Sequence, residues 1–389
     1  MKNIHLSALT ILFLLLTACQ ENLEKAMPQS TCSFANVVHP RAAQYQRIVD
    51  KFMQAGAVGV SITIKTPEGI WSTTAGKADL PNNINLSPCH TLGIGSISKT
   101  VSAATILKLQ EEGKLHIDDL ASKYLLSDEY TKHISNLDKA TIRHLLQHTS
   151  GIRDYLGIGG VLNIHNQSVK AQSAKENLRT IFDKKALFEV GSRWSYSNTN
   201  YLILALIIEN ITGKSAYEVV TEKIIQPLHL QNTYASSTRP ASLSRGYYDS
   251  FNNGMMRDLT KFDYYAVGGQ DMLDGGLVSN SYDLVIFMEA LKTNQLLKPS
   301  SVALMETPTN LQIDDIPENL SYIKDYGLGL FLLDVDGKKG IGHGGNVHCF
   351  NGVAYYFPEQ KVSIAILLNS YSKKLDEILY DKETLKMAF

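Results

Sequence analysis

The chain has 389 residues, of which 44% are hydrophobic and 19% are charged, a profile typical of a globular protein and not of a disordered or fibrous one. Its 37 basic and 38 acidic side chains nearly cancel, so no basic excess is present to neutralise a phosphate backbone, and nucleic acid is excluded as an expected partner. The length suits two or three domains, or one large α/β unit with a helical insertion.

The first residues have the pattern of an export signal. Lys2 precedes an apolar run over residues 6–18, which is shorter than the roughly 20 residues that a membrane-spanning helix needs. The run ends at Leu16-Thr17-Ala18-Cys19, which resembles the cleavage box of bacterial lipoprotein signals. The resemblance implies that residues 1–18 are removed and that Cys19 is lipidated, so that the protein faces the periplasm or the cell exterior. An ordinary signal peptide beside a cysteine is the alternative.

Residues 19–41 connect this signal to the body of the protein. They hold Pro28 and Pro40 and show little periodicity, as expected of a tether. Export permits disulfide bonds, and Cys32 with Cys89 is the first pair to expect, which leaves Cys349 as a small buried apolar residue. Three unpaired thiols remain the alternative.

The body, residues 42–389, opens with strand patterns and continues with a helix. Apolar β-branched segments at 57–64 and 70–75 flank a turn with Pro67 and Gly69 and predict a hairpin. From residue 96 to 112, apolar side chains recur at steps of three or four and predict a helix, which Gly113 ends.

The middle of the body is mostly helical in pattern, and strand patterns return after it. The clearest predicted helices are 141–148, 201–211 and 281–292. The later predicted strands are 327–335, 338–342, 347–357 and 361–369, followed by a helical tail from Leu375.

Strands at both ends of the body predict an α/β (α+β) fold. The N-terminal and C-terminal strands are expected to form one antiparallel sheet flanked by helices, in a sheet lobe of residues 42–114 and 298–389. Residues 115–297 are expected to form an inserted, mostly helical lobe. A cleft between the two lobes is the expected place for a site.

The strongest local signal for chemistry is Gly95-Ser96-Ile97-Ser98-Lys99 at the start of a predicted helix. Residues three apart share a helix face, so the ammonium group of Lys99 can reach the hydroxyl of Ser96. A serine needs a base to become a nucleophile, and a lysine whose pKa is lowered by burial can be that base. Taken alone, the same pattern also fits a capping serine followed by a solvated lysine.

Two later segments extend this signal. Tyr196-Ser197-Asn198 precedes the predicted helix at 201–211, and His343-Gly344-Gly345-Asn346 lies at a predicted strand edge. In this order, the three segments resemble the Ser-x-x-Lys, Tyr-x-Asn and Lys-Thr-Gly or His-x-Gly motifs of the penicillin-binding and class C β-lactamase-like serine hydrolases. Residues 145–151 and 275–287 resemble that family too, and the resemblance runs from about residue 50 to 370.

The resemblance implies roles for the residues of the first two motifs. Ser96 would be the acylated nucleophile, and Lys99 would help to remove its proton. Tyr196 would act with Lys99 as general base and acid, provided that a nearby cation lowers the phenol pKa from about 10. Asn198 would bind Lys99 and the amide of the substrate.

The third motif would contribute to substrate binding. His343 takes the place of the family's lysine, Gly345 would let the strand approach the substrate, and the N–H groups of Ser96 and Asn346 would form the oxyanion hole. The family's threonine is Gly344 here, so a hydroxyl that would bind a substrate carboxylate is missing. His343 is expected to be only partly charged near neutral pH, which also weakens carboxylate binding.

Other sites are disfavoured by their spacing. His144 and His148 have zinc-helix spacing, but Leu145 stands where a metalloprotease needs glutamate, so capping or packing histidines are expected. Ser96 is not within a Gly-x-Ser-x-Gly elbow, which argues against an α/β-hydrolase. No metal and no organic cofactor are expected.

The expected function is that of a serine hydrolase with an acyl-enzyme on Ser96. Its substrate would be a small molecule or peptide with a scissile amide or ester, and the resemblance and the expected location favour a D-Ala-D-Ala carboxypeptidase-like or β-lactamase-related peptidase or amidase. The missing hydroxyl at Gly344 gives weight to a carboxylesterase. A penicillin-binding sensor or scaffold without turnover is a further alternative.

Overall fold

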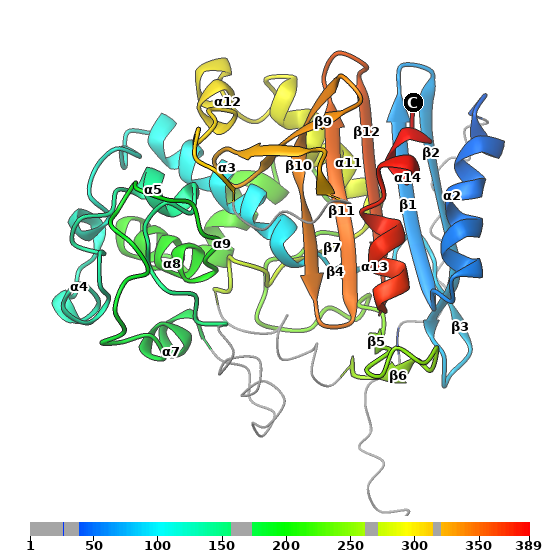
Figure 1. Cartoon of the computed structure of the whole chain (residues 1–389), viewed down its shortest axis with the longest axis horizontal. Helices are drawn as coiled ribbons and strands as arrows, with labels where there is room; N and C mark the ends of the chain where they lie inside the picture. The colour runs from blue at the N-terminus through cyan, green and yellow to red at the C-terminus, as the bar shows by residue number, and fades with distance from the viewer. Residues whose placement is uncertain (1–25, 27–38, 157–172, 261–270, 314–319) are drawn as a thin grey trace, which may run out of the picture.

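An eight-stranded antiparallel sheet is the centre of the molecule in the computed structural model, which describes residues 26, 39–156, 173–260, 271–313 and 320–389 (Figure 1). The strand order is β3-β2-β1-β12-β11-β10-β9-β8. These strands are β1 (Gly59–Thr66), β2 (Gly69–Asp79), β3 (Ile84–Asn85), β8 (Ile323–Tyr326), β9 (Phe331–Val335), β10 (Lys338–Val347), β11 (Phe350–Phe357) and β12 (Val362–Leu368).

Strands from the two ends of the body are neighbours in this sheet. β1 pairs with β12 in an antiparallel register that sets Val60 opposite Leu368, and β1 also forms the predicted hairpin with β2. The predicted fold class, an antiparallel sheet of N- and C-terminal strands flanked by helices, is therefore confirmed (Figure 1). The predicted division into lobes at residues 114 and 298 stays a prediction.

The sequence of β1 reflects helices on both faces of the sheet. Val60, Ile62 and Ile64 belong to the apolar cluster that includes α2 (Ala42–Gln54). The alternate residues are small and polar, because α11 (Ser281–Lys292) covers that face and the Ser281 hydroxyl lies 2.9 Å from the Ser61 hydroxyl. β1 is therefore buried along most of its length.

The remaining helices pack around these layers. α13 (Lys373–Leu379) and α14 (Lys382–Lys386), the predicted helical tail, join α2 on its face of the sheet. α3 (Ser98–Glu111) and α8 (Thr199–Thr212) are almost wholly buried in the second apolar cluster, beside the sheet (Figure 1). The other helices are η2 (Ala121–Tyr124), α4 (Asp128–His133), α5 (Ile142–Leu146), α7 (Ala174–Arg179), α9 (Ala216–Val220), η3 (Thr221–Ile225) and α12 (Pro299–Met305).

The predicted helices and strands are found, but several boundaries of the C-terminal strands differ from the prediction and one strand was missed. β10 continues to Val347, whereas the prediction ended that strand at residue 342 and began the next strand, which starts at Phe350, at residue 347. The glycines in this continuation of β10 are needed where the strand passes close to another segment, as described below. β8 was missed, because it has only four residues and a turn with Gly329 in the left-handed region separates it from β9.

Short ladders connect the rest of the chain to this framework. β4 (Leu92–Gly93) pairs with β7 (Val278–Ser279), and β5 (Tyr247–Tyr248) lies between β6 (Arg257–Asp258) and β13 (Ser370–Tyr371).

Cys89 is disulfide-bonded. The partner expected for it, Cys32, lies outside the described residues, as do residues 1–18 and Cys19. Within the part of the chain that the structure describes, no helix is long and apolar enough to cross a membrane.

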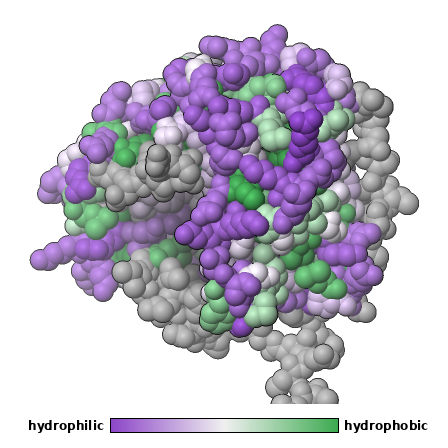
Figure 2. Space-filling model, turned by 45° about the vertical axis from the view of Figure 1, so that its right-hand side comes forward, coloured by the Kyte–Doolittle hydropathy of each residue, from purple (hydrophilic) through white to green (hydrophobic). Residues whose placement is uncertain are grey.

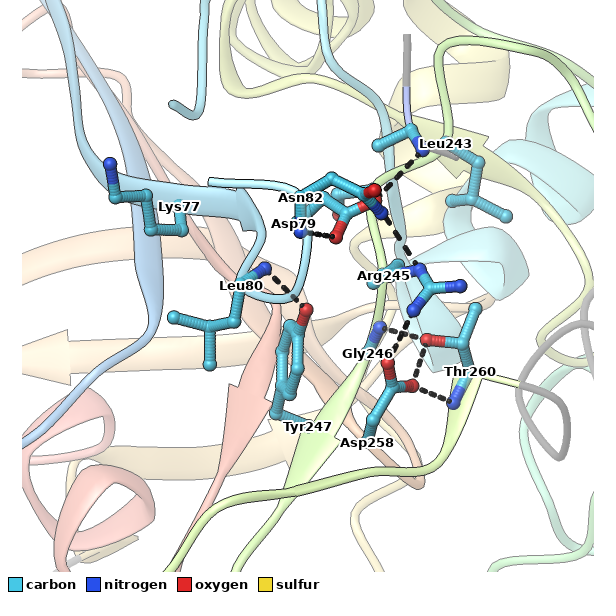
Figure 3. Close-up of polar contacts among 12 residues, drawn as sticks. Lys77, Asp79, Leu80, Asn82, Leu243, Arg245, Gly246, Tyr247, Asp258 and Thr260 are labelled. Carbon is cyan, nitrogen blue, oxygen red and sulfur yellow. Dashed lines mark hydrogen bonds and ion pairs between the residues drawn. The ribbon is translucent and has the colours of Figure 1, made fainter. Parts of the chain in front are cut away.

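A buried ion cluster connects the end of β2 to β6. The Asp79 carboxylate accepts hydrogen bonds from the backbone N–H groups of Ala26 and Asn82 and lies 3.4 Å from the Arg245 guanidinium. Arg245 is 2.9 Å from Asp258, so it lies between two carboxylates (Figure 3). The cluster therefore attaches residue 26 and the β5–β6 hairpin to the edge of the sheet.

The substitution Asp79→Ala is expected to lower the free energy of unfolding by about 3 kcal/mol, because it leaves a buried guanidinium with one carboxylate and removes acceptors from buried N–H groups. Urea denaturation measures this loss. Glu377→Ala removes an exposed ion pair with Lys373 and is the control, with a change of about 0.5 kcal/mol or less. Equal effects of the two substitutions would contradict the prediction.

Candidate active site

Ser96 lies in a tight turn that joins β4 to α3. The turn is the 3₁₀ helix η1 (Gly95–Ile97), and Ser96 is half-buried whereas its two neighbours are buried. Gly95 has a φ of +49°, and a Cβ there would lie 2.6 Å from the Asn346 nitrogen. Glycine is therefore required at this position both for the backbone conformation and for the close approach of β10.

Lys99 is fully buried one turn after Ser96, and its ammonium group has three acceptors. Nζ lies 3.2 Å from Ser96 Oγ, 2.7 Å from Asn198 Oδ1 and 2.5 Å from the carbonyl oxygen of Asp274. Burial lowers the pKa of Lys99 to about 8, although the nearby carboxylates of Asp274 and Asp154 partly offset this effect. A fraction of the protein near neutral pH therefore holds Lys99 as a free amine that can accept a proton.

Tyr196 lies over the same ammonium group. Lys99 Nζ is 4.9 Å from the centre of its ring, and the His148 ring packs against it with centroids 4.2 Å apart. Burial raises the pKa of Tyr196 well above 10, and the nearby Ser96 hydroxyl offsets part of this rise. The expectation that a cation lowers this pKa is wrong, so Tyr196 is a neutral phenol in the resting protein.

Asn198 connects Lys99 to a carboxylate. Its Oδ1 accepts from Lys99, and its Nδ2 donates to Asp154 Oδ2 at 2.7 Å. The structure therefore places Asn198 beside Lys99 as expected, while its role towards a substrate amide stays a prediction. Asp154 was not selected from the sequence, although it closely follows the family-like stretch at 145–151.

Asp274 is the second residue that sequence reasoning missed. Its carbonyl oxygen accepts from Lys99, and its Oδ2 accepts from the Tyr155 hydroxyl at 2.8 Å. Burial raises the pKa of the Asp274 carboxyl, and the Lys99 charge partly offsets this rise. Its position just before Gly275 and Gly276, in the other family-like stretch, was the only signal.

His343 is a neutral, buried imidazole. Its Nδ1 donates to the Gly344 carbonyl oxygen, and its Nε2 accepts from the Tyr326 hydroxyl at 3.2 Å. Burial, with a smaller effect of the Lys99 charge, lowers the pKa of His343 to about 3. The expectation that His343 is partly charged near neutral pH is therefore wrong.

Glycine is required at the two positions after His343 for different steric reasons. A Cβ on Gly345 would lie 2.0 Å from the Ile94 carbonyl oxygen and 3.0 Å from the Ser96 nitrogen. With the contact between Gly95 and Asn346, this brings the backbone nitrogens of Ser96 and Asn346 into the same small region. A Cβ on Gly344 would instead lie 2.5 Å from the Tyr380 hydroxyl, so a threonine there would point away from the Ser96 turn.

The two histidines with zinc-helix spacing have separate structural roles. His144 accepts from the Thr141 backbone N–H and so caps α5. His148 is fully buried and its Nδ1 accepts from the Ser197 backbone N–H, which positions the loop that carries Tyr196. In the described ranges, no group of three or more His, Cys, Asp or Glu side chains is placed to hold a metal ion.

The arrangement supports acyl transfer by a serine. Ser96 supplies a hydroxyl, Lys99 a base with a lowered pKa, and Tyr196 a neutral proton donor, next to the backbone nitrogens of Ser96 and Asn346. These catalytic roles stay predictions.

Comparison with known proteins identifies relatives. The family model described as Beta-lactamase matches residues 45–385. The chain is 26% identical over 349 residues to penicillin-binding protein 4* of Bacillus subtilis, covering 84% of this chain and 71% of that protein. It is 30% identical over 283 residues to the teichoic acid D-alanine hydrolase of Staphylococcus aureus, covering 71% of this chain and 66% of that protein, or just under two thirds of its length.

Solved structures agree with this family. The D-stereospecific amidohydrolase from Streptomyces sp. has a TM-score of 0.71 and 27% identity, covering 87% of this chain and 98% of that chain. The D-amino acid amidase from Ochrobactrum anthropi SV3 has a TM-score of 0.75 over 89% of this chain and 96% of that chain, and at 22% identity it supports the fold alone.

The rate at which a fluorophosphonate probe labels Ser96 is expected to rise with pH through about 8, because only the neutral form of Lys99 can accept the serine proton. Labelling rates measured between pH 6 and pH 11 test this. Lys99→Arg keeps a charged group in place and is expected to react about 10²-fold to 10⁴-fold more slowly. A rise only above pH 10 would indicate Tyr196 as the base and would contradict the prediction.

Proposed function

Because the chain belongs to the beta-lactamase family, we propose that it hydrolyses an amide or ester bond of a D-amino acid through an acyl-enzyme on Ser96. The observation that carries this proposal is the triple contact of the buried Lys99 ammonium group with Ser96, Asn198 and the Asp274 carbonyl. This contact holds a base with a lowered pKa against the one half-exposed hydroxyl of the turn.

Acylation follows from these positions. Neutral Lys99 accepts the Ser96 proton while Oγ attacks the carbonyl carbon, and the oxyanion receives hydrogen bonds from the N–H groups of Ser96 and Asn346. Losing one such donor typically costs about 2.7 to 4 kcal/mol of transition-state stabilisation. The leaving amine or alkoxide takes a proton from Tyr196, which Lys99 reprotonates, and the acyl group stays on Oγ.

Deacylation uses the same groups in reverse. Water gives a proton to Lys99, directly or through Tyr196, and attacks the acyl carbon, and Ser96 Oγ leaves and recovers its proton. The free acid is released. A sensor that acylates without turnover would need this second step to be blocked.

The stereochemical preference is inferred from relatives. The names of the teichoic acid D-alanine hydrolase and the D-stereospecific amidohydrolase both specify the D configuration, and both proteins are at least 27% identical to this chain. Their shared chemistry supports a D-aminoacyl group as the part of the substrate that is transferred to Ser96.

The charge of the site favours substrates without a free carboxylate. D-Ala-D-Ala peptides and β-lactams carry a carboxylate that needs a cation, but His343 is uncharged because of its burial. D-Aminoacyl amides and esters have no such carboxylate. They are therefore better candidates than the carboxypeptidase substrates favoured by the sequence.

A panel of chromogenic substrates tests the proposed activity. D-Alanyl p-nitroanilide and ester substrates are expected to turn over faster than their L-enantiomers and faster than D-Ala-D-Ala peptides with a free carboxylate. Ser96→Ala is expected to lower kcat by about 10³-fold or more, whereas Ser300→Ala, at an exposed serine of α12, leaves it unchanged. A burst with fluorescent penicillin and no turnover on any substrate would favour the sensor.

We also propose that the protein is lipid-anchored through Cys19 and faces the periplasm or the cell exterior. The support is the apolar run at residues 6–18 and its ending in Leu16-Thr17-Ala18-Cys19.

Cys19→Ser is expected to move the protein from the membrane fraction to the soluble fraction, because the acceptor of the lipid is gone. Fractionation of cells followed by immunoblotting measures the change. Cys349→Ser, which changes a buried cysteine of the body, serves as the control and keeps the protein in the membrane fraction. If Cys19→Ser also stays with the membrane, the anchor proposal is wrong.

A further inference from the structure

The hairpin between β5 and β6 ends in an exposed apolar tip. We define the tip as residues 249–257, in which the side chains of Phe251 and Met255 are 64% and 58% exposed. Figure 1 places β5 and β6 at the lower end of the sheet, beside β3, and Figure 2 shows green, apolar surface at the lower end of the molecule. Two large apolar side chains exposed on one short turn make the tip a candidate contact surface.

Contacts within the hairpin fix the conformation of the tip. The Asp249 carboxylate accepts from the backbone N–H groups of Asn253 and Gly254 at 3.0 and 2.8 Å, which closes the turn. Tyr248 stacks on Tyr371 with ring centroids 5.2 Å apart, which holds the base of the hairpin. A partner that covers the tip would therefore have little chain to order.

The charge of the tip favours an anionic surface. Residues 250–257 contain no acidic side chain, and the carboxylate of Asp249 is turned inwards to the backbone of the turn. The Arg257 guanidinium lies 4.4 Å from the centre of the exposed Phe251 ring. An aromatic ring beside an arginine suits the boundary between lipid headgroups and acyl chains.

The start of the body lies next to this hairpin. The Ala26 backbone N–H donates to Asp79, and Asp79 is connected through Arg245 to Asp258 at the base of the tip (Figure 3). Cys19 precedes Ala26 by seven residues, which reach at most about 25 Å when fully extended. A lipid on Cys19 therefore keeps this corner of the body close to the membrane.

We propose that the apolar tip inserts into the headgroup region of the membrane that holds the lipid on Cys19. This contact gives the body a second point of attachment and a fixed orientation. The proposal rests on lipidation of Cys19 and not on the hydrolytic chemistry, so solution activity can fail or succeed independently of it.

The two attachments are expected to act together. Two side chains give too small an apolar area to hold a free protein on a bilayer, and a single lipid chain also binds reversibly. A short tether raises the effective concentration of the tip at the surface to about the millimolar range, at which a weak contact is occupied.

An added tryptophan tests the contact in the full lipidated protein. Phe251→Trp, reconstituted in vesicles with anionic lipids, is expected to show a blue-shifted emission and a loss of fluorescence when the acyl chains are brominated. Leu126→Trp is the matched control, because Leu126 is 84% exposed but precedes α4 in the helical part of the molecule. It should show neither change, and an unchanged thermal unfolding midpoint confirms that both variants are folded.

Three results would overturn the proposal. The first is equal, unquenched emission from the Phe251→Trp and Leu126→Trp variants in vesicles. The second is a blue shift of Phe251→Trp that follows protein concentration without vesicles, which would indicate a second copy of the chain as the occupant. The third is a mass spectrum that shows no lipid on Cys19, because the tether that raises the local concentration would then be absent.

Discussion

The buried ammonium group of Lys99 is the constraint on which the active-site architecture depends. A charge removed from water is tolerated only when its hydrogen bonds are all made, and Lys99 has an acceptor for each N–H in Ser96, Asn198 and the Asp274 backbone. These acceptors come from the turn before α3, the loop before α8 and the segment before β7. Satisfying one ammonium group therefore requires three distant segments of the chain to meet.

The other side of the site depends on the close approach of β10 to the same turn. Gly345 and Gly95 each lie where a Cβ would overlap backbone atoms of the facing segment. A strand that touches the backbone of the nucleophile's turn brings two backbone nitrogens together without any side chain between them. The sheet thus positions the two backbone nitrogens, while the helical part supplies the base Lys99 and the phenol of Tyr196.

Sequence patterns were sufficient for the fold class and for Ser96, Lys99, Tyr196 and Asn198, because their motifs and the strand periodicity are local signals. They could not identify Asp274, since its backbone oxygen holds Lys99 and a backbone acceptor has no residue signature. They also missed the state of His343, which depends on burial beside Tyr326 and Phe331. Both residues come from strands at the far edge of the sheet, and one of those strands was not predicted.

The resting site also leaves buried polar atoms without hydrogen-bond partners, among them the Tyr196 hydroxyl. Within the described residues, the Tyr196 hydroxyl is buried and makes no hydrogen bond, a state that typically costs about 1 to 3 kcal/mol. Its ring is held between Lys99 and His148, so it cannot turn to a new partner without loss of packing. A nitrogen or oxygen atom of a substrate, placed beside Ser96, would supply the missing hydrogen bond. The phenol would therefore form its hydrogen bond only when a leaving group is present. An interaction that is absent from the resting protein and forms during the reaction lowers the barrier, because it stabilises the transition state more than the resting state.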